Sequence, residues 1–192
     1  MKTSRMEAFS DGVLAIIITI MVLELEPPET IDREAFRILI PTLVSYLLSF
    51  IYVAIYWNNH QHLLYKLNRL NGKVLWSNMH WLFWMSLIPF STAWVGMNPL
   101  ETVPTVFYGV ILLLCAVSYL FLQKSVVQCE GKTSDLAKEI GYDWKGKASL
   151  LVYATGIIFA FWLPVVSYIT YFIVAIGWFI PDARIDKTIH NS

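Results

Sequence analysis

Long apolar stretches that carry almost no charged residues limit most strongly how this chain can fold. A helix that crosses a bilayer needs about 20 mostly apolar residues, because the hydrocarbon core is about 30 Å thick and a helix rises about 1.5 Å per residue. Stretches that meet or approach this length are Phe9–Leu25, Ile38–Trp57, Val74–Val95, Val103–Leu122 and Ala148–Ile180. Only 15% of the residues are charged, and they cluster between these stretches. We therefore predict an integral membrane protein.

The last stretch is too long for one span and contains Pro164 near its middle. Because proline interrupts the hydrogen-bond ladder of a helix, we predict two short helices, Ala148–Leu163 and Val165–Ile180. The fold class is then all-α, a polytopic membrane protein with six transmembrane helices. We find no internal repeat, so residues 1–192 form a single six-helix transmembrane domain. We expect interior loops over Asn58–Gly72 and Gln123–Lys147, with Ser134 capping a short helix in the second loop.

The distribution of charge predicts the orientation. Six spans place both termini on one side of the membrane, and twelve of the 14 basic residues fall on that side. These are Lys2, Arg5, Lys66, Arg69, Lys73, Lys124, Lys132, Lys138, Lys145, Lys147, Arg184 and Lys187. Basic loops stay in the cytoplasm, so both termini are predicted to be cytoplasmic. The other side carries mainly acidic residues, which would concentrate cations near it.

Composition also excludes some functions. The net formal charge is zero, which gives no general attraction for nucleic acid. The two cysteines, Cys115 and Cys129, lie in different segments, so a disulfide framework or a metal pair is not expected. No catalytic motif is present, and we predict a protein that is not an enzyme and needs no cofactor.

The first span carries an unusual charged residue, Asp11. A carboxylate in a transmembrane segment is costly and needs a partner. Arg5 lies six residues earlier, which is a poor spacing for a pair on a straight helix. We therefore expect the partner of Asp11 on another helix or another subunit, with Ser10 adding a hydrogen bond.

Helical geometry gives the same span a second face. At about 100° per residue, Ile16, Ile20 and Leu23 fall within about 60° of arc, and Asp11 points about 140° away from Ile16. The same stripe is continued by Phe9, Gly12 and Thr19. The stripe is either a surface for lipid or for the protein core, or the lining of a narrow pore that opposes hydrated ions by dewetting. Periodicity alone leaves both interpretations open.

Short motifs in residues 5–90 resemble those of a known family. Arg5-xxx-Phe9-Ser10-Asp11 resembles the signature of the transmembrane protein 175 family, which contains endolysosomal potassium channels of animals and their bacterial and archaeal homologues. Two further motifs are similar to that family's Trp-xx-His and Asn…Pro-Phe patterns, namely Trp57-Asn58-Asn59-His60 and Asn78 followed by Leu87-Ile88-Pro89-Phe90.

The resemblance implies a quaternary structure and a function. Animal members have two six-span repeats and this chain has one, so it resembles a prokaryotic member that forms a homotetramer in the cell membrane. The first helix of each subunit would line a central pore for potassium ions, surrounded by membrane lipid. The Thr-Val-Gly-Tyr-Gly filter of ordinary potassium channels is absent from this sequence, as it is from the family.

The resemblance also assigns residues. The constriction would be Ile16, followed by layers at Ile20 and Leu23, and Thr19 matches a hydroxyl position linked to selectivity. A structural network that holds the first helix would comprise Arg5, Phe9, Ser10, Asp11, His60 and Asn78. No role follows for His62 or His80, and His80 is either a partner of the Asp11 network or a satisfied histidine inside the bundle.

Three other functions remain open. Asp11, His60 and His80 could form the proton relay of a proton-coupled secondary transporter or a proton-leak pathway. His60 and His62, beside two asparagines, could bind a metal in a membrane enzyme, although a third ligand is not evident. A structural or assembly role needs no motif at all.

Overall fold

The computed structural model describes residues 3–28, 33–131, 133–141 and 143–179. Every regular element in these ranges is an α-helix, which confirms the all-α prediction for this part of the chain. The helices are α1 (Thr3–Leu23), α2 (Arg33–Tyr65), α3 (Gly72–Met85), α4 (Ile88–Met97), α5 (Thr102–Glu130), α6 (Asp135–Ile140), α7 (Trp144–Phe159) and α8 (Pro164–Phe179).

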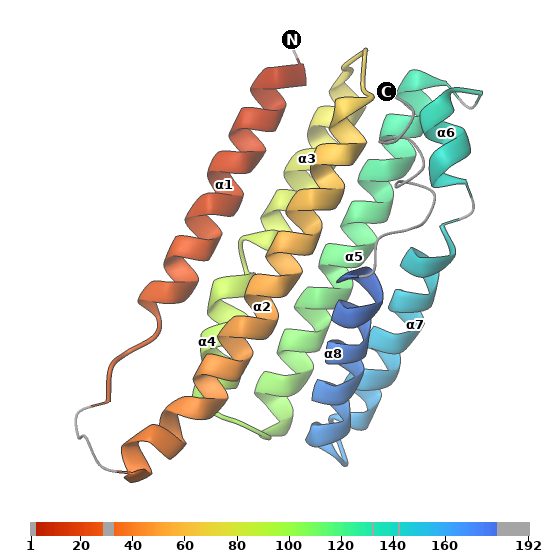
Figure 1. Cartoon of the computed structure of the whole chain (residues 1–192). Helices are drawn as coiled ribbons and strands as arrows, with labels where there is room; N and C mark the ends of the chain where they lie inside the picture. Colours follow the sequence, from red (N-terminus) through yellow and green to blue (C-terminus); the bar gives the residue numbers. More distant parts are fainter. Residues whose placement is uncertain (1–2, 29–32, 132, 142, 180–192) are drawn as a thin grey trace.

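The long helices run side by side as an elongated bundle (Figure 1). Helices α3 and α4 follow one another along it, and α7 and α8 form a hairpin. In the described ranges, three segments are long and apolar enough to cross a membrane, namely Thr3–Leu23, Phe36–Tyr65 and Thr102–Glu130. The prediction of a multi-pass membrane protein fits these segments, whereas the count of six spans stays a prediction.

Two helices extend further than the sequence suggested. Helix α2 continues to Tyr65, so His60 and His62 are helical, and the expected loop over Asn58–Gly72 is wrong in its first half. The reason is that the buried face continues beyond the polar residues, with His60 and Leu63 both packed in the interior. Helix α5 likewise continues to Glu130 and buries Val126.

The third apolar stretch is interrupted, and the expectation of a continuous helix over Val74–Val95 is wrong. Helix α3 ends at Met85 and α4 begins at Ile88. Pro89 lies in the first turn of α4, where its missing N–H is tolerated but cannot continue the ladder of α3. The hydroxyl of Ser86 donates to the carbonyl of Phe83 at 2.7 Å and satisfies part of the broken end.

The predicted break near Pro164 and the predicted cap at Ser134 are both confirmed. Pro164 is the first residue of α8, and α7 ends at Phe159. The Ser134 hydroxyl accepts a hydrogen bond from the amide of Ala137 at 3.2 Å, at the start of α6.

Polar contacts join the helices inside the bundle. The Thr92 hydroxyl of α4 donates to Ser49 of α2 at 2.7 Å, and Ser49 lies 2.9 Å from the Tyr108 hydroxyl of α5. Gly109 lets Tyr171 of α8 approach α5, because a Cβ at this glycine would overlap the Tyr171 ring. Hydrogen bonds and close backbone approach are the usual attractions between helices in lipid, where apolar burial contributes little.

The basic residues divide between the two ends of the bundle. Most of those in the described ranges lie near the start of α1, around the α2–α3 connection, in the last part of α5 and in α6, toward one end. Lys145 and Lys147 are in the first turn of α7, which begins farther along the bundle (Figure 1). Arg33 and Arg37 lie at the other end, at the start of α2. Lys2, Lys132, Arg184 and Lys187 lie outside the described residues. This division is the one that the predicted orientation requires.

Candidate functional site

Helix α1 has one face that packs against the rest of the chain. Its buried residues recur every three or four positions, which forms a stripe along the helix. They are Met6, Ser10, Leu14, Ile17 and Met21, each at most 2% exposed. This stripe faces α2, α3 and α4.

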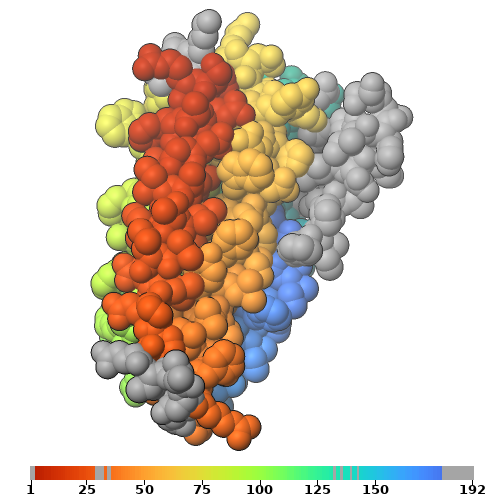
Figure 2. All heavy atoms as spheres, turned by 60° about the vertical axis from the view of Figure 1, so that its left-hand side comes forward, coloured from red at the N-terminus to blue at the C-terminus, as the bar shows by residue number. Residues whose placement is uncertain are grey.

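The other face of α1 is uncovered in the chain. Ile16 is 59% exposed, Ile20 42% and Leu23 74%. Figure 2 shows α1 lying along the outside of the bundle, with its outer face open along its length. Thr19 is exposed on this face, and its hydroxyl donates to the carbonyl of Ala15 at 2.9 Å. The four residues predicted to line a pore therefore lie on the face of α1 that faces away from the bundle. We call it the open face.

A chain of buried hydrogen bonds ties α1 to α3 and α2. The Ser10 hydroxyl donates to the carbonyl of Met6 at 2.8 Å and accepts from the side-chain amide of Asn78 at 2.9 Å. The carbonyl oxygen of the same amide lies 2.8 Å from Nε2 of His60. His60 also stacks on Trp81, with ring centroids 4.7 Å apart. The structure thus brings together three residues that the resemblance assigned to one network.

Asp11 is held separately. Its Oδ1 accepts hydrogen bonds from Nε1 of Trp57 at 3.0 Å and from Nε2 of Gln61 at 2.9 Å. Both donors belong to α2, which confirms that the partner of Asp11 lies on another helix. Sequence reasoning missed Gln61, although its position four residues after Trp57 places the two side chains on one helical face.

The other residues of the predicted network lie apart from these bonds. Arg5 is exposed, and no hydrogen bond or ion pair links it to another residue in the described ranges. Phe9 is 53% exposed, on the side of the open face. The role of both in holding α1 stays a prediction.

His62 and His80 make no hydrogen bond to Asp11 in the described part of the chain. His80 is exposed and accepts a hydrogen bond from Nε1 of Trp84 at 3.0 Å, so it joins neither the Asp11 contacts nor the bundle interior. His62 is exposed on α2. Within the ranges that the structure covers, three or more His, Cys, Asp or Glu side chains nowhere gather closely enough to hold a metal ion.

The chain is similar in sequence to known proteins. Residues 5–89, which hold the Ser10, Asp11, His60 and Asn78 contacts, match the family described as endosomal/lysosomal potassium channel TMEM175. A protein of Chryseobacterium sp. (strain P1-3) that is named a potassium channel is 44% identical over 192 residues, covering all of both chains. The chain belongs to the TMEM175 family.

More distant relatives extend this comparison. A second protein named a potassium channel, from Chamaesiphon minutus, is 32% identical over 127 residues, or 62% of this chain and 63% of that one. The human endosomal/lysosomal proton channel TMEM175 is 26% identical over 131 residues, which is 65% of this chain but only 25% of the human protein.

A solved structure agrees with the bundle as a whole. The crystal structure of a lysosomal potassium-selective channel TMEM175 homologue from Chamaesiphon minutus superposes with a TM-score of 0.77 at 26% identity. The match covers 92% of this chain and 95% of that one. The helical arrangement described above is therefore the fold of this TMEM175 homologue.

Proposed function

We propose that this chain forms a potassium-permeable cation channel, and that four copies surround a pore lined by the open face of α1. The observation that carries the proposal is the division of α1 into a packed face and an apolar open face. The open face would meet the pore, while Ser10 and Asp11 fix the helix to α2 and α3. Relatives named potassium channels support the same function.

The chemistry of the open face suits a selective constriction. Ile16 would form the narrowest ring and Ile20 and Leu23 the next layers, so an ion must shed part of its hydration shell to pass. Potassium is more weakly hydrated than sodium and should lose this water more easily. The Thr19 hydroxyl hydrogen is already bonded to its own helix. The free lone pair of its oxygen can therefore face a passing cation.

The membrane topology completes the proposal. Helices α1, α2 and α5 would each cross once, α3 and α4 together would make one crossing, and α7 and α8 would each make one. The six crossings put both termini in the cytoplasm of a prokaryote, because most basic residues lie at that end. The opposite mouth would carry Glu24, Glu26 and Glu101 and attract cations.

Bilayer recording with potassium on one side and sodium on the other tests the function and the constriction together. The wild-type channel should show a reversal potential that favours potassium, and Ile16→Asn should move it toward zero because a polar ring admits hydrated ions. Ile173→Asn is the matched control, since Ile173 lies on α8 and is 55% exposed. Equal permeability ratios in wild type and Ile16→Asn would count against the constriction, and no current would count against the channel.

A proton-leak pathway is the second candidate, because mammalian relatives are named proton channels. Proteoliposomes with a pH gradient and no potassium distinguish it. Rapid collapse of the pH gradient in wild type, at the same rate without potassium as with it, would favour proton permeation. Flux that saturates and couples to a second solute would instead favour a transporter.

A further inference from the structure

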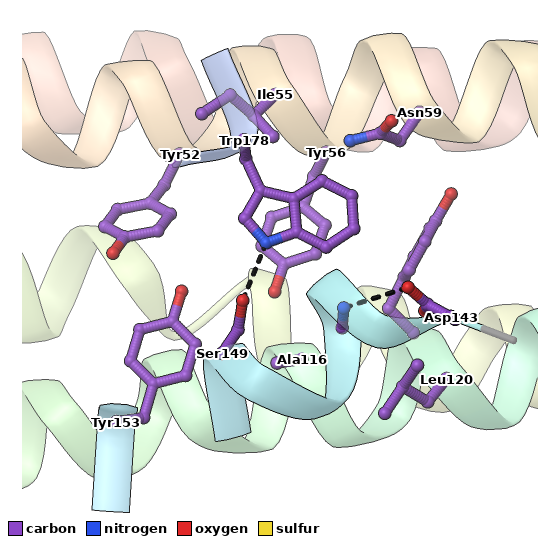
Figure 3. Close-up of a pocket in the computed structure, with 12 residues that line it drawn as sticks. Tyr52, Ile55, Tyr56, Asn59, Ala116, Leu120, Asp143, Ser149, Tyr153 and Trp178 are labelled. Atoms are coloured by element: carbon purple, nitrogen blue, oxygen red, sulfur yellow. Dashed lines mark hydrogen bonds between the residues drawn. The ribbon is translucent and has the colours of Figure 1, made fainter. Parts of the chain in front are cut away.

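A small cavity lies inside the bundle of the single chain. Its volume of about 30 Å³ is enough for at least one water molecule, which needs about 10–15 Å³ on the same measure. Figure 3 shows side chains from α2, α5, α7 and α8 around it. None of its lining residues belongs to α1. The cavity is therefore separate from the open face that the proposed pore uses.

Aromatic rings make up much of the wall. The rings of Tyr56 and Tyr119 pack with centroids 5.5 Å apart, and those of Tyr52 and Tyr153 lie 6.2 Å apart. Trp178 lines the cavity from α8, where its indole N–H donates to Ser149 at 2.8 Å (Figure 3). The faces of aromatic rings carry partial negative charge and attract cations. Such walls favour a cation over an anion.

Asp143 supplies the carboxylate of this lining. Its Oδ1 accepts a hydrogen bond from the amide of Gly146 at 2.9 Å and caps the start of α7. Its Oδ2 is buried and has no hydrogen-bond partner among the residues that the structure describes. A buried carboxylate oxygen without a partner is costly. This atom therefore favours an occupant of the cavity that can neutralise it.

Gly146 keeps the space beside this oxygen open. A Cβ at this position would overlap Oδ2 of Asp143. Alanine is a better helix former than glycine by about 1 kcal/mol, and the first turn of α7 forgoes that gain. The glycine thus lets the carboxylate stay at the cavity instead of turning outward.

We propose that the cavity binds one small monovalent cation, potassium or ammonium, between Oδ2 of Asp143 and the aromatic rings. The volume admits one ion of water size. Cation–π attraction and a single carboxylate suit a weakly hydrated monovalent ion. A calcium ion would need six to eight oxygen ligands, as a general rule, with several carboxylates to balance its charge, and the described part of this lining offers one carboxylate.

The position of the ion gives it a structural consequence. Asp143 precedes α7, and the rings around it come from α2, α5 and α8. A bound ion would therefore tie the start of α7 to three other helices. On the proposed orientation this is the cytoplasmic half of the subunit, so the site would respond to cytoplasmic cations independently of ions in the pore.

Crystals grown with thallium(I) in place of potassium test the site directly. An anomalous peak beside Oδ2 is expected in wild type and should vanish in Asp143→Asn. Asparagine caps helices as well as aspartate does, so α7 should still begin at the same place. An ordered water only, without anomalous signal, would overturn the proposal. So would a cavity peak that persists in Asp143→Asn.

Thermal unfolding of the full chain in detergent provides a second measurement. At constant ionic strength, replacing sodium by potassium or by ammonium should raise the apparent midpoint of wild type by about 2 °C or more. The separate potassium and ammonium arms show which ion is bound. An equal midpoint in sodium, potassium and ammonium would contradict the site.

Variants of the lining test whether a rise in the unfolding midpoint comes from an ion in the cavity. Asp143→Asn should lose it, and Gly146→Ala should lose it because the new Cβ displaces the carboxylate. Gly177→Ala should keep it, because that glycine has open space around its Cβ position. Ile16→Asn should also keep it, which separates this site from the pore. A rise retained in Asp143→Asn but lost in Ile16→Asn would place the ion in the pore and refute the cavity site.

Discussion

Replacing Asn78 by alanine should destabilise the subunit and loosen α1 from its neighbours. Asn78 is fully buried and bonds to both Ser10 and His60. Hydrogen bonds between helices in lipid contribute about 0.6 kcal/mol on average and up to about 1.7 kcal/mol. Two lost bonds therefore cost about 1–3 kcal/mol.

The groups that are left behind add to this cost unequally. Ser10 keeps its bond to the carbonyl of Met6, so its hydroxyl hydrogen stays satisfied. His60 is left without a hydrogen bond in the described part of the chain, because its Nδ1 has no partner there and the variant removes the partner of Nε2. Stranding a buried polar group costs about 1–3 kcal/mol. The total predicted loss is about 2–6 kcal/mol of unfolding free energy.

Reversible unfolding in mixed micelles can measure this loss, with a double-mutant cycle of Asn78→Ala and Ser10→Ala. The two losses should be non-additive by about 0.5 kcal/mol or more, since the residues share a bond. Asn58→Ala is the control, because Asn58 is exposed on α2. A loss in Asn78→Ala no larger than in Asn58→Ala, or strict additivity with Ser10→Ala, would refute this reasoning.

Two further predictions concern the packed face of α1 and the connection between α2 and α3. Ile17→Ala should lower the unfolding free energy by about 2 kcal/mol. This is the lower end of the range for truncating a buried side chain, because the side chain is compared with lipid instead of water. Ile16→Ala should cost less than about 1 kcal/mol. The same mixed-micelle titration would contradict this if both variants lost equal stability. Glu130→Ala should speed hydrogen exchange at the amides of Asn68 and Arg69, because Oε1 accepts from both at 2.6 and 2.9 Å. Unchanged exchange by mass spectrometry would show that this carboxylate does not hold the loop.

Much of the fold follows from local properties of the sequence. The apolar runs locate the long helices, although not their ends, and Pro164 marks the turn between α7 and α8. The grouping of Ile16, Ile20 and Leu23 on one face of α1 was predictable, because their angular positions depend only on helix geometry. That this face is uncovered in the chain came from the structure.

What the sequence could not supply depends on how helices rotate against each other. A partner for Asp11 was required by the cost of a charge in lipid, but its identity as Trp57 and Gln61 depends on which face of α2 meets α1. The apolar stretch ends at Trp57, so a loop was expected from Asn58, whereas helix α2 continues there with His60 packed in the interior. At Pro89 the apolar pattern continues unchanged, so hydrophobicity gave no sign of the interruption.

The interruption between α3 and α4 affects how these two helices can move against α1. Asn78 on α3 is hydrogen-bonded to Ser10, near the start of α1. Beyond the break, α4 packs against α1 and accepts a hydrogen bond from Thr42 of α2. Since the backbone ladder is already broken between Met85 and Ile88, the two segments can tilt separately without losing further helical hydrogen bonds. A displacement of α4 therefore need not be transmitted to α3, nor to the end of α1 that Asn78 holds.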